Sequence, residues 1–210
     1  MEQKTGSLII DVQKWIPHQN EGHQCDNAYY KECTEPIYYE SVKEKLFNIN
    51  NWHQLAGKEK ALFFHTDKKG TIVDRCPKVG DHIKIKLPGI QNIFKDIFDW
   101  VQIIQIENIT AIKDLRLLKM TLRPTKDPQT SELKTAHFLD NDATNTILLA
   151  MDKQHIQISI HGRNEKVNTF PFPYILKNIR NQIIAKTGFI GLNSIQWQCF
   201  VEGLLDKKNK

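Results

Sequence analysis

Hydrophobic and polar residues alternate along most of the chain, and this pattern predicts a protein rich in β-strands. The alternation is strictest at residues 82–87 (HIKIKL), where the basic side chains fall on one face and the aliphatic ones on the other. Residues 143–165 read as two strands joined by a short turn, with a stripe of isoleucines in the second. Looser alternation predicts four further strands, at residues 7–16, 61–64, 98–109 and 115–123.

Three other segments have the spacing of amphipathic helices. Residues 38–49 carry Tyr39, Val42 and Leu46 on one stripe, and residues 174–186 and 194–205 carry similar stripes. Residues 18–36, in contrast, are polar, lack any period and end in proline. They are therefore predicted to form a long loop.

The order of these elements predicts an α+β fold. Short turns between neighbouring strands favour an antiparallel sheet, and its apolar face has to be covered by the helices. We expect a curved antiparallel sheet of about six to seven strands, covered by a short N-terminal helix and two C-terminal helices. Residues 1–36 would form an N-terminal strand and polar loop packed on or extending from the main domain. Residues 37–206 would form that single domain, and residues 207–210 a tail.

Composition narrows the class of protein more than it identifies a function. A chain of 210 residues with 25% charged residues and a net charge of +5 is ordinary for a globular domain, and the charge permits an acidic partner without requiring one. No segment has the roughly 20 apolar residues of a membrane span, and the charged N-terminus does not resemble a signal peptide. Four scattered cysteines do not form a disulfide framework, so we expect a cytoplasmic location, with export by a machine that reads no N-terminal signal as the open alternative.

Reactive side chains are densest at residues 161–165 (HGRNE), at the end of the second predicted strand. An acid–base enzyme could use His161 as a proton shuttle, Glu165 to orient it and Arg163 to hold an anionic substrate. The alternative interpretation is a strand-ending turn, because Gly162 and the polar residues after it are typical of turns. Turns gather these residue types without any chemistry, so the turn is the favoured interpretation.

Two further patterns concern metal and nucleic-acid binding. His18, His23, Cys25 and Cys33 offer soft-metal donors, but the spacing lacks the close ligand pairs of common zinc modules. We therefore expect no metal and no cofactor. A basic face on the sheet could bind nucleic acid through four residues: Lys84, Lys86, Lys119 and Arg123. Stacking aromatic residues are not interleaved with them, so nucleic acid is the less favoured partner.

Aromatic residues supply the candidate ligand- or partner-binding site. The run Phe170-Pro171-Phe172-Pro173-Tyr174 is held extended by its prolines, and its three aromatic side chains are difficult to bury together in a loop. We predict that Phe170, Phe172 and Tyr174, with Trp100 from a neighbouring strand, contact a partner protein or a small apolar ligand.

The order of elements resembles the helix-grip arrangement of START-like domains, in which a sheet wraps a C-terminal helix and can leave an apolar cavity. The paired C-terminal helices depart from the single long helix of that family. Three phrases, GDHIKI at residues 80–85, DWV at residues 99–101 and HGRNE at residues 161–165, are also similar to segments of uncharacterised bacterial proteins. Some of those are encoded near contractile, type VI-like secretion genes. This likeness would span residues 60–205.

These observations favour a non-enzymatic protein that binds a partner protein or a small apolar ligand. The bacterial resemblance implies an accessory, effector or immunity protein of a secretion system. Two alternatives stay open. One is a START-like enzyme that uses His161, Arg163 and Glu165, and the other is a nucleic-acid-binding protein with a basic sheet face. The enzyme requires its three side chains to converge on one concave pocket.

Overall fold

The computed structural model describes residues 7–55, 61–86, 98–109, 113–131, 139–166 and 189–206, with the backbone alone at residues 189–196. Within these ranges, seven strands form one antiparallel sheet in the order β1-β7-β6-β5-β4-β3-β2. The strands are β1 (His23–Glu32), β2 (Leu62–Thr66), β3 (His82–Lys86), β4 (Asp99–Ile109), β5 (Arg116–Pro124), β6 (Thr144–Met151) and β7 (His155–Glu165). The helices are α1 (Pro36–Phe47), α3 (Phe189–Leu205) and the short 3-10 helices η1 (Gln13–Trp15) and η2 (Ile49–Gln54).

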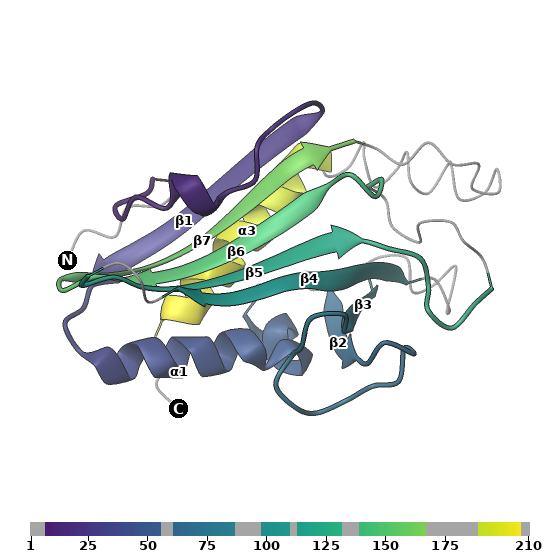
Figure 1. Ribbon diagram of the computed structural model, residues 1–210, viewed down its shortest axis with the longest axis horizontal. Coiled ribbons are helices and arrows are strands. Elements are labelled where there is room, and N and C mark those ends of the chain that lie inside the picture. Colours follow the sequence, from purple (N-terminus) through teal and green to yellow (C-terminus); the bar gives the residue numbers. More distant parts are fainter. Residues whose placement is uncertain are drawn as a thin grey trace.

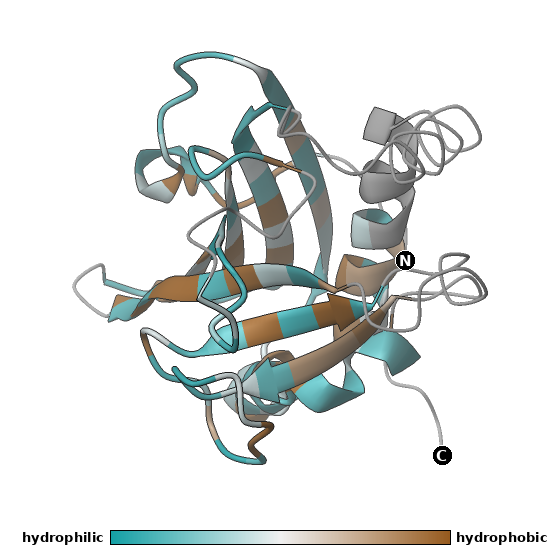
Figure 2. Cartoon of the chain, turned by 90° about the vertical axis from the view of Figure 1, so that its right-hand side faces the viewer, coloured by the Kyte–Doolittle hydropathy of each residue, from teal (hydrophilic) through white to brown (hydrophobic). Residues whose placement is uncertain are grey.

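One face of the sheet, here called the inner face, carries the main core. Its isoleucine stripe in β7 (Ile156, Ile158 and Ile160) is completely buried, together with residues of α1, η2 and α3. Trp52 of η2 lies at the centre of this core, with the rings of Phe63 and Phe200 packed edge-on at 5.6 and 5.0 Å. The predicted hairpin and the facing of its isoleucines are confirmed. Alternating hydrophobic and hydrophilic bands mark the strands in Figure 2.

Helix α3 lies against the inner face, over β1 and β7, and α1 runs beside the sheet at the end where β7 begins (Figure 1). The carbonyl groups at the C-terminus of α3 have no partners within the helix, and neighbouring elements supply donors for them. The Tyr38 hydroxyl and the Lys31 ammonium donate to the Leu205 carbonyl, and Lys45 Nζ donates to the Leu204 carbonyl at 3.2 Å. This end of the fold is therefore closed by both apolar packing and hydrogen bonds.

Part of the opposite, outer face, over β5, β6 and β7, is covered by residues 7–22, which lie in front of the sheet in Figure 1. The predicted strand at residues 7–16 is wrong, because this segment forms bends and η1 instead. Its alternation reflects a different contact: Ile10 and Val12 are buried against apolar residues of β5 and β6. Gln157 replaces a neighbouring strand as hydrogen-bond partner, since its Oε1 accepts from the amides of Ile9 and Ile10 at 2.7 and 3.0 Å.

The predicted loop at residues 18–36 is also wrong, because it contains the edge strand β1. Strand β1 pairs antiparallel with β7, from His23 opposite Glu165 to Glu32 opposite His155. Only the middle of β1 is buried, at Asn27, Ala28 and Tyr29. An edge strand with one solvated side needs few apolar residues, which explains why the segment lacks a clear hydrophobic period.

The predicted α+β class, with a curved antiparallel sheet and helical cover, is confirmed, and the arrangement is consistent with a helix-grip fold. The first predicted helix corresponds to α1, and the helix predicted at residues 194–205 begins earlier, at Phe189. The helix predicted at residues 174–186 lies outside the described residues. None of the helices in the described ranges is long and apolar enough to cross a membrane.

Candidate functional site

The C-terminal end of β7 departs from strict alternation through a β-bulge. Asn164 has a left-handed backbone conformation, with φ of 54°, and the pairing with β1 shifts between His23 and Cys25. A bulge adds one residue to one strand and changes the face on which the following side chain lies. His161 and Arg163 therefore lie on the outer face, whereas the side chain of Glu165 lies on the inner face, over Gly162. Residues 161–165 belong to β7 and pair with β1 on both sides of the bulge, so the predicted strand-ending turn is wrong.

On the outer face, His161 and Arg163 have polar partners. His161 contacts Asp26 Oδ1 through Nδ1 at 2.7 Å and Ser159 Oγ through Nε2 at 2.9 Å. Arg163 donates to Asp26 Oδ1 at 2.8 Å and to the Gly162 carbonyl at 2.7 Å. Burial alone would raise the pKa of Asp26, but the hydrogen bonds from His161 and Arg163 outweigh it and hold that pKa below its ordinary value.

The contacts Asp26–His161–Ser159 have the same order as a hydrolase triad. Ser159 has no exposed surface and His161 has 1%, because residues 7–22 and the neighbouring strands enclose them. A nucleophile must reach the carbonyl carbon of its substrate, so this serine is not placed for catalysis. The cluster instead satisfies buried polar groups between β1 and β7.

On the inner face, one oxygen of the Glu165 carboxyl has no such partner among the described residues. Its side chain is 6% exposed, and Oε1 is buried without a hydrogen bond. Asn145, opposite Gly162 on β6, also has a buried oxygen, Oδ1, without a partner. Both oxygens lie beside the position that a Cβ of Gly162 would occupy, at 2.4 Å from Glu165 Oε1 and 3.3 Å from Asn145 Oδ1. The absent side chain of Gly162 is what lets these oxygens approach each other.

Two more buried polar atoms without partners lie on the inner side of the sheet. Asp99 begins β4 on the inner side, and its Oδ2 has no partner. Trp197 of α3 packs on the core with its Nε1 also unpartnered, eight residues before the Leu205 that contacts Tyr38. We call the group Asn145, Glu165, Asp99 and Trp197 the polar end of the inner face. A fifth unpartnered atom in the described residues, Thr144 Oγ1, lies on the outer side.

The surroundings change the acidity of both carboxyls in the polar end. Burial raises the pKa of Glu165 to about 7, and the nearby Arg163 opposes this rise. Burial alone raises the pKa of Asp99 to about 7. An ionised carboxylate in an apolar environment needs hydrogen-bond donors or an opposite charge, and no donor among the described residues reaches Glu165 Oε1 or Asp99 Oδ2. Both are therefore poised to ionise when a donor or a cation arrives.

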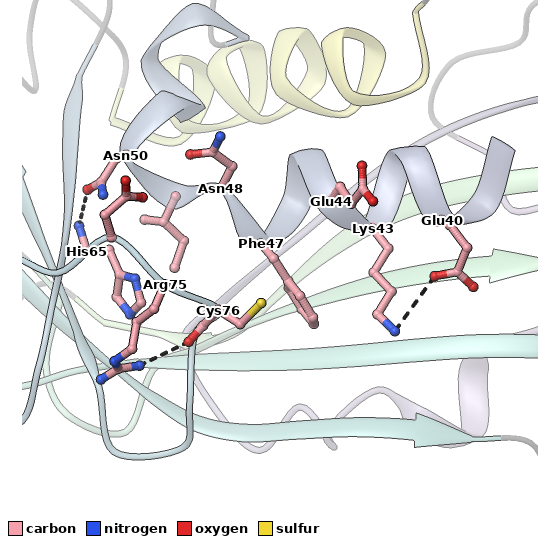
Figure 3. A pocket seen from close by; sticks show the side chains of 11 residues that line it. Glu40, Lys43, Glu44, Phe47, Asn48, Asn50, His65, Arg75 and Cys76 are labelled. Atoms are coloured by element: carbon pink, nitrogen blue, oxygen red, sulfur yellow. Dashed lines mark hydrogen bonds and ion pairs between the residues drawn. The ribbon is translucent and has the colours of Figure 1, made fainter. Parts of the chain in front are cut away.

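A separate open cleft of about 390 Å³ lies between α1 and the loop that joins β2 and β3. Its walls come from α1, η2 and the loop between β2 and β3, and include Lys43, Phe47, Arg75 and Cys76 (Figure 3). The volume falls in the range of small-molecule sites, roughly 300–1,000 Å³. The exposed Cys76 thiol makes no hydrogen bond to the ring of His65, which is also part of the cleft wall.

The loop that forms this cleft is fixed by one buried carboxylate, Asp81. It accepts hydrogen bonds from His65 Nε2 at 3.0 Å, from both Arg75 terminal nitrogens at 2.6 and 2.9 Å, and from the Lys78 amide at 2.9 Å. Burial would raise the pKa of Asp81, but these donors lower it to about 2. The network ties the loop to β2 and satisfies the buried carboxylate without any chemistry. Two large apolar side chains of the same loop, Ile72 and Val79, are exposed.

The predicted site residues do not come together. His161 and Arg163 are separated from Glu165 by the sheet, so the convergent acid–base pocket is not formed. Trp100 is 1% exposed on the outer side, where the Lys84 ammonium lies 5.4 Å from its ring centre and the His82 ring stacks edge-on. The predicted aromatic residues of the ligand or partner site, Phe170, Phe172 and Tyr174, lie outside the described residues.

The residues predicted to bind nucleic acid or metal lie on several elements of the sheet. The basic residues predicted for nucleic acid all lie on the outer side of their strands: Lys84, Lys86, Lys119 and Arg123. Of the possible metal ligands, His23 and Cys25 lie in β1, with His18 before it and Cys33 after it. Among the residues for which side chains are described, no three His, Cys, Asp or Glu side chains are grouped to hold a metal.

Sequence reasoning missed three members of the polar end: Asn145, Asp99 and Trp197. Asn145 and Asp99 are polar residues near the start of apolar strands, where a polar residue usually marks only the strand boundary. A usable signal existed in the pairing itself, because an inner-face position on a buried strand is normally apolar. Recognising it requires the register and the bulge at Asn164, which the sequence pattern does not reveal.

Comparisons with known proteins add little to this description. No protein-family model and no curated protein sequence matches the chain. Among solved structures, Ara h 8.0201 matches with 13% identity and a TM-score of 0.30, over 84% of this chain and 98% of that one. TTHA0849 from Thermus thermophilus matches with 9% identity and a TM-score of 0.35, over 87% and 94%. A Thalictrum flavum norcoclaurine synthase mutant, solved with a transition-state analogue, matches with 12% identity and a TM-score of 0.29, over 87% and 98%. These scores are too low to bear on the activity of this chain.

Proposed function

We propose that the protein is a non-enzymatic binding protein that takes up a small, largely apolar ligand against the inner face. The observation that supports the proposal is the set of buried, unpartnered polar atoms at one end of an otherwise apolar wall. Each buried polar group without a partner costs about 1–3 kcal/mol, so such groups are rare in folded proteins unless something else satisfies them. A bound molecule with a polar head and an apolar body would supply both kinds of contact.

The arrangement of the wall favours this interpretation over a set of unrelated defects. Along β6 and β7 the inner face is apolar from Met151 and Ile156 as far as Ile147 and Ile160. It then becomes polar at Asn145 and Glu165, where the Glu165 carboxyl fills the space that a Cβ of Gly162 would need. Ligand sites typically combine apolar walls with a few placed polar groups.

The substitution Gly162→Ala tests the proposal directly. The added methyl group would occupy the space between Glu165 Oε1 and Asn145 Oδ1, and it fits if the flexible Glu165 side chain moves. The matched control is Ser159→Ala, an outer-face change on the same strand. Native mass spectrometry of the protein purified from its own host would detect a bound small molecule. We expect about one equivalent in the wild type and the control, and none in Gly162→Ala with an unchanged circular dichroism spectrum. Equal loading of Gly162→Ala, or no bound molecule in the wild type, would contradict the proposal.

A second candidate function is recognition of a partner protein through the open cleft and the loop between β2 and β3. The specific observation is that the buried Asp81 network fixes a loop that exposes Ile72 and Val79, at 60% and 52%. Exposed apolar side chains on a rigid surface are typical of protein contacts. The predicted role in a bacterial secretion system stays a prediction based on three short sequence phrases.

The second candidate is tested with Ile72→Asp and Val79→Asp combined in one variant. Ile37→Asp, which changes a 77% exposed side chain at the start of α1, is the control. We expect the double variant to lose a partner that the wild type and the control both capture, with the same melting temperature in all three. If all three capture the same proteins, the loop is not the contact surface.

A further inference from the structure

We propose that the ligand of the polar end is an organic amine, bound through its protonated nitrogen by Glu165 and Asn145. This inference rests on the proposed function, because it names the class of molecule that the same site accepts. The kinds of atoms left without partners favour an amine. Three of the four in the polar end are acceptor oxygens, and two of these belong to carboxyls, whereas Trp197 Nε1 is a donor.

The positions of two oxygens suit a single nitrogen. Glu165 Oε1 and Asn145 Oδ1 lie within 2.4 and 3.3 Å of the same point above Gly162. Two acceptors this close can both receive hydrogen bonds from one donor atom at the usual N···O distance of about 2.9 Å. An ammonium group has up to three N–H donors, so it could satisfy both oxygens and retain one donor for another group. If the side-chain amide of Asn145 were rotated by 180°, its Nδ2 would donate a hydrogen bond to Glu165. A bound amine would compete with that hydrogen bond.

Charge also favours an amine over an acid or an alcohol. The described side chains supply no Lys or Arg to Glu165 Oε1, because Arg163 is on the outer face and donates to Asp26 and Gly162. Burial raises the pKa of the Glu165 carboxyl to about 7, so a substantial fraction is neutral at pH 7, and a cation beside it would drive its ionisation. A carboxylate ligand would instead meet the Glu165 carboxyl with no described cation beside Oε1. An alcohol would satisfy one oxygen without using the charge.

Three probes of the same shape distinguish these classes: 3-phenylpropylamine, 3-phenylpropan-1-ol and 3-phenylpropanoate. Their affinities for the full chain would be measured by calorimetry at pH 7, with the indole N–H signals of the tryptophans as an independent readout. Trp197→Phe identifies the Trp197 signal. We expect the amine to bind about tenfold more tightly than the alcohol, as one charge-assisted hydrogen bond supplies, and the acid to bind most weakly.

Glu165→Gln separates this inference from the proposed function. The variant keeps the shape of the site and removes the charge, so the amine should lose its tenfold advantage while the alcohol binds as before. Glu32→Gln, an exposed change at the other end of β1, should leave all three affinities unchanged. If the amine and the alcohol bind equally to the wild type, the amine class is wrong and the ligand site stands. If none of the probes binds at millimolar concentration, ordered water accounts for the unpartnered atoms and both proposals fail.

Discussion

The two faces of β7 differ in whether their buried polar side chains have hydrogen-bond partners. On the outer face, His161 and Arg163 are buried and each has partners, with Asp26 shared between them. On the inner face, Glu165 is equally buried and its Oε1 has none. A satisfied polar cluster stabilises and orients a fold, whereas an unsatisfied one needs another reason to persist. The residues that look catalytic in the sequence are thus divided between a structural role and a candidate binding role.

The largest expected effect concerns the apolar part of the inner face. Ile158 has no exposed surface, and Ile158→Ala should lower the free energy of unfolding by about 2–5 kcal/mol. Urea denaturation followed by circular dichroism would measure it. A loss below about 1 kcal/mol, typical of surface positions, would mean that the inner face of β7 is not a tightly packed core.

Removing the satisfied outer cluster should be the next most costly change. His161→Ala leaves a cavity and removes two polar partners at a site that is 1% exposed, so we expect a loss of about 2–4 kcal/mol. Denaturation of the double variant with Asp26→Asn would show how much of the loss belongs to the pair. Strictly additive effects would show that the two side chains are not coupled.

A substitution that removes the charge of the unpartnered Glu165 carboxyl should raise the free energy of unfolding, in contrast to the two substitutions above. The pKa of Glu165 is about 7 in the folded protein and 4.5 in the unfolded chain, so the folded protein holds more protons between these values. The free energy of unfolding therefore falls as pH rises through this window and stays low above it. Glu165→Gln should be more stable than the wild type by about 1–3 kcal/mol at pH 8, and close to it at pH 4. Paired denaturation curves at both values would measure the difference. The same gain at pH 4 would show that the ionisation of Glu165 is not its cause.

A smaller effect is expected at the bulge itself. Asn164 has a positive φ, and its side chain accepts from the amides of Asn20 and Glu21 at 2.8 and 3.3 Å. Asn164→Gly keeps the backbone and loses the contacts, whereas Asn164→Ala also strains the backbone by about 1 kcal/mol. Alanine should therefore be less stable than glycine by about that amount, and both should speed proteolysis within residues 7–22. Equal stability of the two variants would show that the left-handed conformation is not retained.

The last prediction is that Ser159 does not react with a probe for catalytic serines. A fluorophosphonate probe, which labels activated serines, should not modify Ser159 despite its contact with His161, because the serine is fully buried. Mass spectrometry of peptides would measure the labelling, with a serine hydrolase as positive control. Labelling at Ser159 would show that the outer cover opens and that this cluster is more than structural.

The sequence predicts some elements of this fold better than others. The core strands and α1 are predictable because burial repeats with the period of the backbone. Strand β1 escapes prediction because an edge strand is solvated along one side, and residues 7–16 mislead because Ile10 and Val12 are buried against a sheet face without being part of the sheet.

The candidate site is less predictable than the fold because it depends on long-range pairing. Gly162 matters only because Asn145 lies opposite it, and Glu165 faces inward only because of the bulge at Asn164. The cleft beside α1 similarly depends on Asp81, whose donors come from three places in the chain. Local patterns contain none of this information.

The pairing of β1 with β7 has a consequence for how the protein is made. Asp26 and His161 are 135 positions apart, and Asn20 and Asn164 are 144 apart. During synthesis β1 leaves the ribosome early and must wait for its partner until most of the chain has followed. An apolar strand with free edges would be prone to pair with other nascent chains during that delay. The polar composition that hides β1 from sequence-based prediction would keep it soluble until β7 arrives.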